Sequence, residues 1–132
     1  MQDADHILAI VGPRAEGHGA TMTLDRGQAN VVFASGRSQR VTIEENETHV
    51  LLESIAMRRA DEKIGRAQLD DVILRTNHAT EAVGVRRKNG ALTAFLKLLK
   101  HTLDRDEAIH AIVSVAREAD RIEMLMTGRD EE

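Results

Sequence analysis

The sequence of 132 residues predicts an α+β fold: an antiparallel β-sheet formed by a meander plus a hairpin, with helices packed on it. Three observations predict this class. Segments with alternating apolar and polar residues lie in the first half of the chain, an Asn-Gly turn signal lies at residues 89–90, and an amphipathic helical repeat follows residue 104. The length fits a single domain over residues 1–132.

Residues 3–11 form a short helix or strand that ends at Gly12-Pro13 and carries five consecutive apolar residues. A short terminal element with so many apolar side chains needs a cover. We expect this element to lie outside the domain core, where a partner covers it. The candidate partner-binding residues are Ile7, Leu8, Ile10 and Val11.

Residues 12–21 have the G-x-x-x-x-G spacing of a phosphate-binding loop but lack the rest of that motif. The motif needs Lys and then Ser or Thr after the second glycine, and those places hold His18 and Gly19. We therefore expect a flexible connector. Met22 and Leu24, which follow it, belong either to a strand or to a packing segment.

Two strands of the meander are predicted at residues 28–34 and 39–44, with a break at residues 35–37. Each has an apolar face, which we assign to the core through Val31, Phe33, Val41 and Ile43. Residues 49–58 fit either a third strand or a helix by their apolar spacing.

A helix is predicted at residues 60–76 from the spacing of Ile64, Leu69, Val72 and Ile73. Gly65 weakens it, and Asn77-His78 ends it.

The hairpin is predicted around Asn89-Gly90, because a type I′ turn needs positive φ at both central residues. In this register Val85 lies opposite Ala94, and Phe95 lies opposite Gly84, where an aromatic ring can cover a glycine. One face of residues 83–97 is then apolar and the other polar. The alternative is a helix, since the apolar residues from 92 to 103 also follow a helical spacing.

The last helix is predicted to start at the N-cap Asp104, with Glu107 completing a capping box, and to stop at Gly128. Its apolar stripe is formed by Ile109, Ile112, Val113, Ala116, Ala119, Ile122 and Met126. Val115 and Leu125 widen this stripe beyond what one sheet face needs, which indicates a second contact.

The composition bounds the function. The chain has no cysteine, which excludes disulfides and thiolate metal sites. Its first residues predict neither a signal peptide nor a membrane span. We therefore expect a cytoplasmic protein without membrane insertion. The net charge is −4, but residues 75–105 hold 7 Lys/Arg against 2 Asp/Glu. That basic segment fits the solvated face of a hairpin, or a nucleic-acid contact, and we expect no specific nucleic-acid binding.

No spacing of catalytic residues indicates an enzyme, and none indicates a cofactor. Glu107 and His110 have the spacing of a carboxylate-bridged metal site, but no second such pair exists to complete it. We therefore expect no enzyme activity, no cofactor and no metal.

An alternative function is a small DNA-binding transcriptional regulator with a helix-turn-helix around residues 67–99. Gly84 would lie at its turn, and the basic residues Arg86, Arg87 and Lys88 would open the recognition helix. Asn89-Gly90 would then fall in the first turns of that helix, where both residues are poor helix formers.

Residues 25–126 resemble the class I type III secretion chaperone family, the Tir-chaperone or CesT type. The resemblance lies in the order of the segments DRGQANVVFA, RVTIEENETHVLLES, DDVILRTNH, EAVGVRRKNGALTAFLK and READRI. It implies a type III secretion chaperone-like fold, with a third strand at residues 49–57.

The resemblance also implies a function. A chaperone of this family is a homodimer that binds a non-globular segment of an effector and keeps it secretion-competent without doing chemistry. It implies effector contacts at the first helix and the nearby sheet surface, although residues 3–11 are shorter than the family's usual first helix. It implies a dimer interface through Leu69, Val72, Ile73, Val83 and Val85.

Overall fold

Alternation of apolar and polar side chains builds a seven-stranded antiparallel sheet in the computed structural model, which describes residues 5–58, 70, 73–74 and 83–127. The strand order is β1-β2-β3-β4-β5-β7-β6, so a five-stranded meander is followed by a hairpin. The strands are β1 (Arg14–Gly17), β2 (Ala20–Asp25), β3 (Gln28–Phe33), β4 (Ser38–Glu45), β5 (His49–Met57), β6 (Gly84–Lys88) and β7 (Ala91–Leu99).

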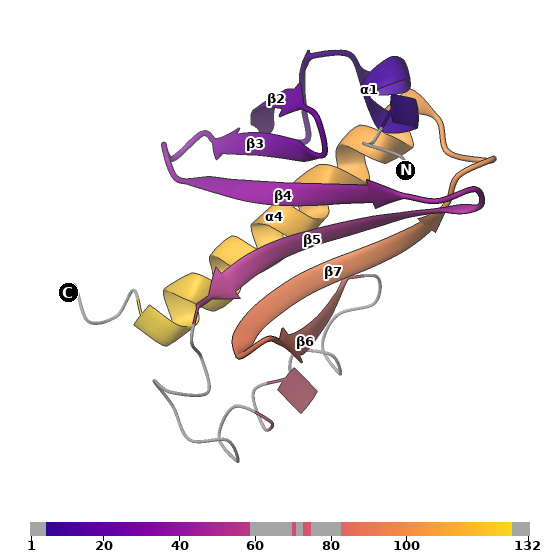
Figure 1. Ribbon diagram of the computed structural model, residues 1–132. Coiled ribbons are helices and arrows are strands. Elements are labelled where there is room, and N and C mark those ends of the chain that lie inside the picture. The colour runs from indigo at the N-terminus through magenta and orange to yellow at the C-terminus, as the bar shows by residue number, and fades with distance from the viewer. Residues whose placement is uncertain (1–4, 59–69, 71–72, 75–82, 128–132) are drawn as a thin grey trace.

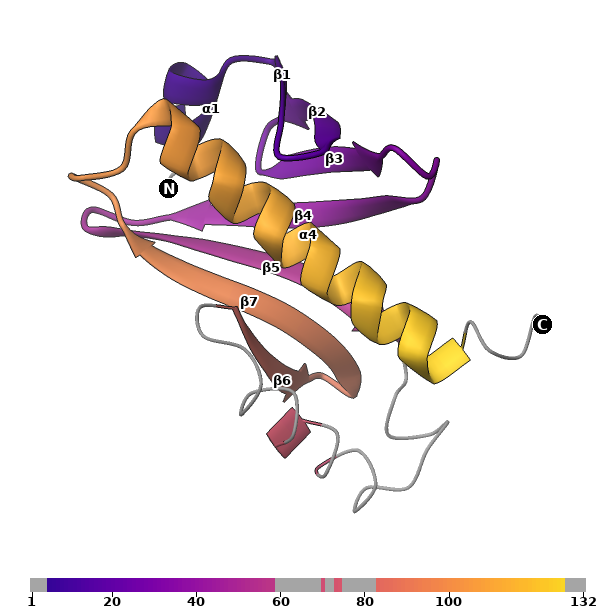
Figure 2. The ribbon, with the colours of Figure 1, turned by 180° about the vertical axis from the view of Figure 1, so that it is seen from behind.

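Two helices are described from end to end, and residues 70, 73 and 74 are helical as well. The long helix α4 (Arg105–Thr127) lies diagonally across one face of the sheet, and the short helix α1 (Asp5–Val11) lies beside its start (Figures 1 and 2). We call the face covered by α4 the inner face and the opposite one the outer face. The predicted α+β class, an antiparallel sheet with helices packed on it, is confirmed.

The hairpin of β6 and β7 has the predicted register. Gly84 pairs with Phe95 and Val85 with Ala94, and Asn89 and Gly90 have φ angles of 53° and 80°. A Cβ built on Gly84 would lie 2.7 Å from the Phe95 ring, so the ring covers a position that only glycine leaves open. The helical alternative for this stretch is wrong, and the helix-turn-helix built on it is wrong with it.

The expected connector at residues 12–21 is wrong, because β1 and β2 form a second hairpin there. Its turn consists of His18 and Gly19, with φ angles of 55° and 85°, and histidine is one of the residues that tolerate this region. The meander therefore has five strands, whereas the sequence predicted two and the family resemblance implied a third. Alternation of buried Met22 and Leu24 with exposed threonines was the signal for β2.

The remaining elements follow the sequence where they are described. β5 is the third strand that the family resemblance implied, with the implied bounds. The capping box of α4 is present, since the Glu107 amide donates to the Asp104 carboxylate (2.8 Å) and the Asp104 amide donates to the Glu107 carboxylate (3.1 Å). The predicted helix at residues 60–76, apart from residues 70, 73 and 74, lies outside the described residues, as does Gly128.

The core lies between α4 and the inner face of the sheet. The helix contributes Ile109, Ile112, Val113, Val115, Ala116, Ala119 and Ile122, all buried. Val31, Val41 and Ile43 are buried opposite them, as predicted, while Phe33 is half-buried at the border. Val115 is part of this core, whereas Leu125 is exposed near the end of the helix.

The expectation that residues 3–11 lie outside the core is wrong. Ile7 is 1% exposed and Val11 3% exposed, and both belong to the core. The cause is the Glu45 carboxylate at the end of β4, which accepts hydrogen bonds from the amides of His6 (3.1 Å) and Ile7 (2.8 Å). Lys100 Nζ forms an ion pair with Oε1 of the same carboxylate, at a distance of 3.3 Å. A negative charge at the start of a helix is favourable, and this one holds α1 against the domain.

We predict that Glu45→Gln lowers the free energy of unfolding by about 1–3 kcal/mol. The glutamine side chain has no negative charge, so it bonds less strongly to the two backbone amides and to Lys100. Chemical denaturation measures this change, and hydrogen exchange at the His6 and Ile7 amides should become faster. Glu44→Gln, one residue earlier on the exposed outer face, is the matched control and should change stability by less than about 0.5 kcal/mol. Equal effects of the two substitutions would contradict the proposed anchor.

Candidate functional site

The sheet splits between β4 and β5. Their ladder runs from the Glu45–Val50 pair to the Thr42–Glu53 pair and ends there, although β4 begins at Ser38 and β5 continues to Met57. In a continued register Arg40 would face Ile55. Figure 1 shows the two strands close together near their connecting turn and apart at their other ends, with α4 visible behind.

The two strands separate because each follows its other neighbour. Residues 38–42 of β4 stay paired with β3, and β5 stays paired with β7 as far as the Met57–Leu92 pair. The β5–β7 register shifts between Ile55 and Met57, and such an irregularity bends a strand and increases its twist.

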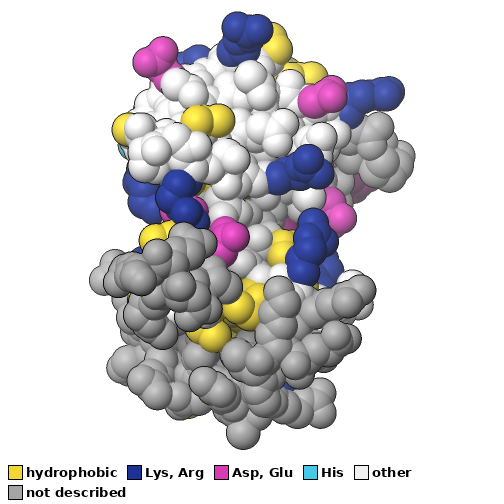
Figure 3. All heavy atoms as spheres, turned by 90° about the vertical axis from the view of Figure 1, so that its left-hand side faces the viewer, with side chains coloured by type: hydrophobic (Ala, Val, Ile, Leu, Met, Phe, Trp, Pro, Cys, Tyr) yellow, Lys and Arg dark blue, Asp and Glu magenta, His cyan; other side chains and the backbone are white. Residues whose placement is uncertain are grey.

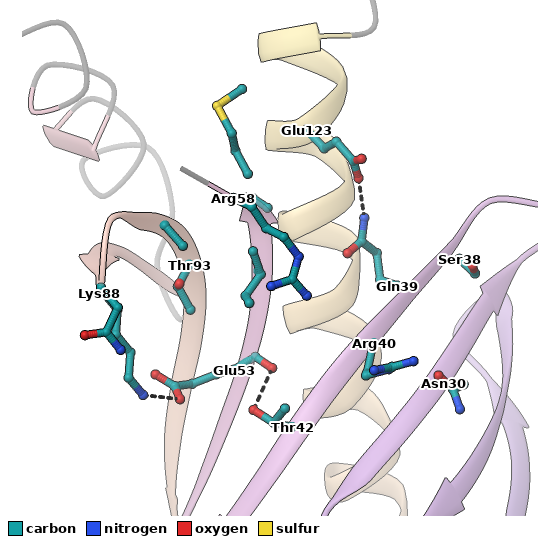
Figure 4. Close-up of a pocket in the computed structure, with 15 residues that line it drawn as sticks. Asn30, Ser38, Gln39, Arg40, Thr42, Glu53, Arg58, Lys88, Thr93 and Glu123 are labelled. Atoms are coloured by element: carbon teal, nitrogen blue, oxygen red, sulfur yellow. Dashed lines mark hydrogen bonds and ion pairs between the residues drawn. The ribbon is translucent and has the colours of Figure 1, made fainter. Parts of the chain in front are cut away.

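A groove with a volume of about 800 Å³ occupies this split (Figure 4). It extends from β3 across β4 and β5 to the turn between β6 and β7, and the end of α4 contributes Glu123. Most of its lining is polar or charged. The described lining residues are Asn30, Ser38, Gln39, Arg40, Thr42, Glu53, Ile55, Ala56, Met57, Arg58, Lys88, Asn89, Ala91, Thr93 and Glu123.

The Glu53 carboxylate closes one side of the groove. It is on the outer face yet only 7% exposed, and it accepts hydrogen bonds from Lys88 Nζ (2.7 Å) and Arg86 Nη2 (2.5 Å). The Arg86 guanidinium also lies over the Phe95 ring, 4.4 Å from its centroid. The two charged hydrogen bonds connect β5 to the β6–β7 hairpin, and the stacking holds Arg86 in place within the hairpin.

Two opposing effects set the pKa of Glu53. Burial by itself raises the pKa of this carboxyl, but the hydrogen bonds from Lys88 and Arg86, together with their positive charges, outweigh it. The net result is a pKa below the ordinary value of 4.5. Glu53 is therefore ionised at neutral pH, and its charge is compensated inside the protein.

Polar side chains bridge the split on its inner side. The Ser54 hydroxyl donates to the Arg40 carbonyl (2.8 Å), which a regular ladder would have paired with a backbone amide of β5. Gln39 Nε2 donates to Glu123 Oε1 (2.7 Å), so β4 is linked to α4 below the groove (Figure 4). Hydrogen bonds from the side chains of Ser54 and Gln39 therefore stabilise the separated arrangement of β4 and β5.

The residues predicted to bind a partner do not line this groove. Ile7 and Val11 are buried, and Leu8 and Ile10 are half-buried on α1. Figure 1 shows α1 beside the start of α4, whereas Glu123 lies near the end of that helix. Alternation along β4 and β5 was visible in the sequence, but the point at which their pairing stops had no sequence signal.

The predicted dimer interface is spread over different environments. Leu69 and Val72 lie outside the described residues, and Ile73 is half-buried. Val83 and Val85 are buried in the core of the same chain, so their side chains are not on its surface. The interface stays a prediction.

In the described part of the chain, no group of three or more His, Cys, Asp or Glu side chains is arranged to hold a metal ion. Glu107 is engaged in the capping box, and His110 contacts His18 with the ring centroids 4.6 Å apart. Of the helices in this part of the chain, none combines the length and the apolar character that crossing a membrane requires.

Comparisons with known proteins give a weak structural likeness. No protein-family model matches the chain, and no curated protein matches it. Among solved structures, the chain is similar to a chain in the structure of the HopA1–SchA chaperone–effector complex, with 14% sequence identity and a TM-score of 0.42. The match covers 69% of this chain and 73% of that one. A likeness of this size identifies neither a family nor a function.

We predict that Glu53 stabilises the fold at neutral pH and loses this effect in acid. Because its pKa is lower in the folded protein than in the unfolded chain, its contribution is complete above the ordinary value of 4.5 and disappears as pH falls through the folded pKa. The measurement is urea unfolding of the unmutated protein and of Glu53→Gln across this range, with Glu16→Gln on exposed β1 as the baseline. A stability difference for Glu53→Gln that grows in acid would refute the assignment.

Proposed function

We propose that this protein binds an extended segment of a partner polypeptide in the groove between β4 and β5. The observation that carries the proposal is the ladder that ends at Thr42–Glu53 while both strands continue. Strand backbone that has lost its neighbour is a template for another strand. Residues 38–41 and 54–57 supply two such stretches, one on each side of the groove.

The dimensions of the groove suit a peptide. A strand rises about 3.3 Å per residue, so the four residues from 38 to 41 can pair with a partner segment over about 13 Å. Main-chain hydrogen bonds along this length would supply affinity that does not depend on the partner's sequence.

The lining of the groove favours a polypeptide over a small metabolite. Small-molecule sites are mostly apolar with a few placed polar groups. Here the apolar lining residues are Ile55, Ala56, Met57 and Ala91, and the other described lining residues are polar or charged. Such a surface suits the regularly spaced polar groups of an extended backbone.

The family resemblance of residues 25–126 supports a narrower version of the proposal. In a class I type III secretion chaperone the bound segment belongs to an effector, which the chaperone keeps secretion-competent. The partner would be unfolded when free and would lose conformational entropy on binding, so contacts beyond the groove are needed. The half-buried Leu8 and Ile10 on α1 are candidates for such contacts.

We predict that Thr42→Trp weakens peptide binding by at least about tenfold. Thr42 is exposed on the outer face at the fork of the split, where an indole would fill the groove. Unstructured peptides selected by display against the unmutated protein would be measured by fluorescence anisotropy. Thr23→Trp, the same change at an exposed outer-face position of β2 that does not line this groove, is the control and should bind like the unmutated protein.

The same peptides should shift the backbone amide resonances of residues 38–41 and 54–57. Peptides that bind Thr42→Trp as tightly as the unmutated protein, or that shift α1 alone, would contradict the proposed site. Tight binding of a metabolite with no peptide binding would contradict the proposed function.

We also predict that the protein is a homodimer, as the family resemblance implies. Sedimentation velocity at micromolar concentration should show twice the mass of the chain, 14.6 kDa. A well-folded monomer under these conditions would refute the prediction.

A further inference from the structure

Two arginines line the groove, and no ion pair between described residues includes either of them. Arg40 extends from β4, and Arg58 extends from the end of β5 over the groove (Figure 4). Both side chains are exposed. Figure 3 shows basic side chains on this side of the molecule, with acidic ones between them and apolar ones at the border of the residues that are not described.

The two acidic side chains of the groove have different partners. Glu53 is bonded to Lys88 and Arg86. Glu123 accepts a hydrogen bond from Gln39 Nε2, and Arg37 Nη2 lies 3.9 Å from the same carboxylate oxygen. Arg37 Nε donates to Asp120 (2.8 Å), so two carboxylates share this arginine. Positive charge therefore remains on the open side of the groove at Arg40 and Arg58. The Glu53 group keeps one further positive charge, because two cations share one carboxylate.

Resting on the proposed function, we infer that the groove takes an acidic segment of the partner polypeptide, with carboxylates at alternate positions. Side chains of a strand point alternately to the two faces of a sheet. Those on the outer face would meet Arg40, whose guanidinium offers paired donors that match a carboxylate. Those on the inner face would meet Ala56 and Met57, whose apolar side chains offer a carboxylate no hydrogen-bond donor.

The same charges argue against a nucleic acid as the occupant. The chain as a whole carries a net charge of −4, which repels a long polyanion. No aromatic residue is among the described lining residues, so the groove has no platform on which bases can stack. A short acidic peptide needs only the local charge of the two arginines.

The test uses the full chain and a soluble peptide in which Glu alternates with Val, measured by calorimetry at low and high salt. Versions with Gln or Lys in place of Glu are the matched ligands. Arg40→Gln/Arg58→Gln should lower the affinity for the Glu peptide by about tenfold or more, and the Gln and Lys peptides should bind the unmutated protein correspondingly less well. Added salt should weaken the Glu peptide most.

The control variant is Arg14→Gln/Arg26→Gln, which removes the same charge from two exposed positions outside the groove and should bind the Glu peptide like the unmutated protein. If the Gln peptide binds as tightly as the Glu peptide and Thr42→Trp weakens both, the inferred acidity is wrong and the proposed function stands. If no peptide binds, both are wrong. A single-stranded DNA oligonucleotide that displaces the Glu peptide at a lower concentration than free Glu peptide would overturn the inferred occupant.

Discussion

The ion triad of Glu53, Arg86 and Lys88 is the interaction on which the shape of the sheet depends. A carboxylate placed on the outer face of β5 is buried, and it remains charged because two cations of β6 bond to it. Removing either cation would leave part of a buried charge uncompensated. β5 is therefore tied to the β6–β7 hairpin at the position where its pairing with β4 ends, and beyond that position it follows β7.

A second buried carboxylate marks the other end of the same ladder. Glu45 pairs with Val50 next to the turn, points to the inner face, and caps α1. The β4–β5 ladder thus extends between two buried acids, one that anchors a helix and one that anchors a hairpin. The closed end of the ladder is part of the core, whereas the open end leaves strand backbone beside a groove.

The groove combines features that a peptide site needs and that a packed core would not tolerate. Its walls are strand stretches that have no strand neighbour on the groove side. Its inner side is crossed by the Ser54 and Gln39 hydrogen bonds, and its open side carries Arg40 and Arg58. The first feature supports recognition of an extended backbone, and the last favours one charge pattern over others. Affinity and selectivity would then come from different atoms of the same site.

Features that depend on neighbours along the chain could be predicted from the order of the amino acids. Asn89-Gly90 set the register of the hairpin, Asp104 and Glu107 set the start of α4, and alternation placed β3 and β4, because turn, cap and pleat geometry are local. The β1–β2 hairpin was missed because His18-Gly19 is a less common turn pair, although the residues after it alternate.

The burial of particular apolar and charged residues, and the point where strand pairing stops, depend on contacts between segments that are distant in the sequence. Ile7 and Val11 form a short apolar element that a partner or a core could equally cover, and a carboxylate 38 residues away brings it into the core. Glutamate is usually a surface residue, and the burial of Glu53 requires two cations from a hairpin that is distant in the sequence. The split between β4 and β5 results from competition between neighbouring strands. No local sequence pattern predicts it, because each strand has the same alternation of apolar and polar residues as a fully paired strand.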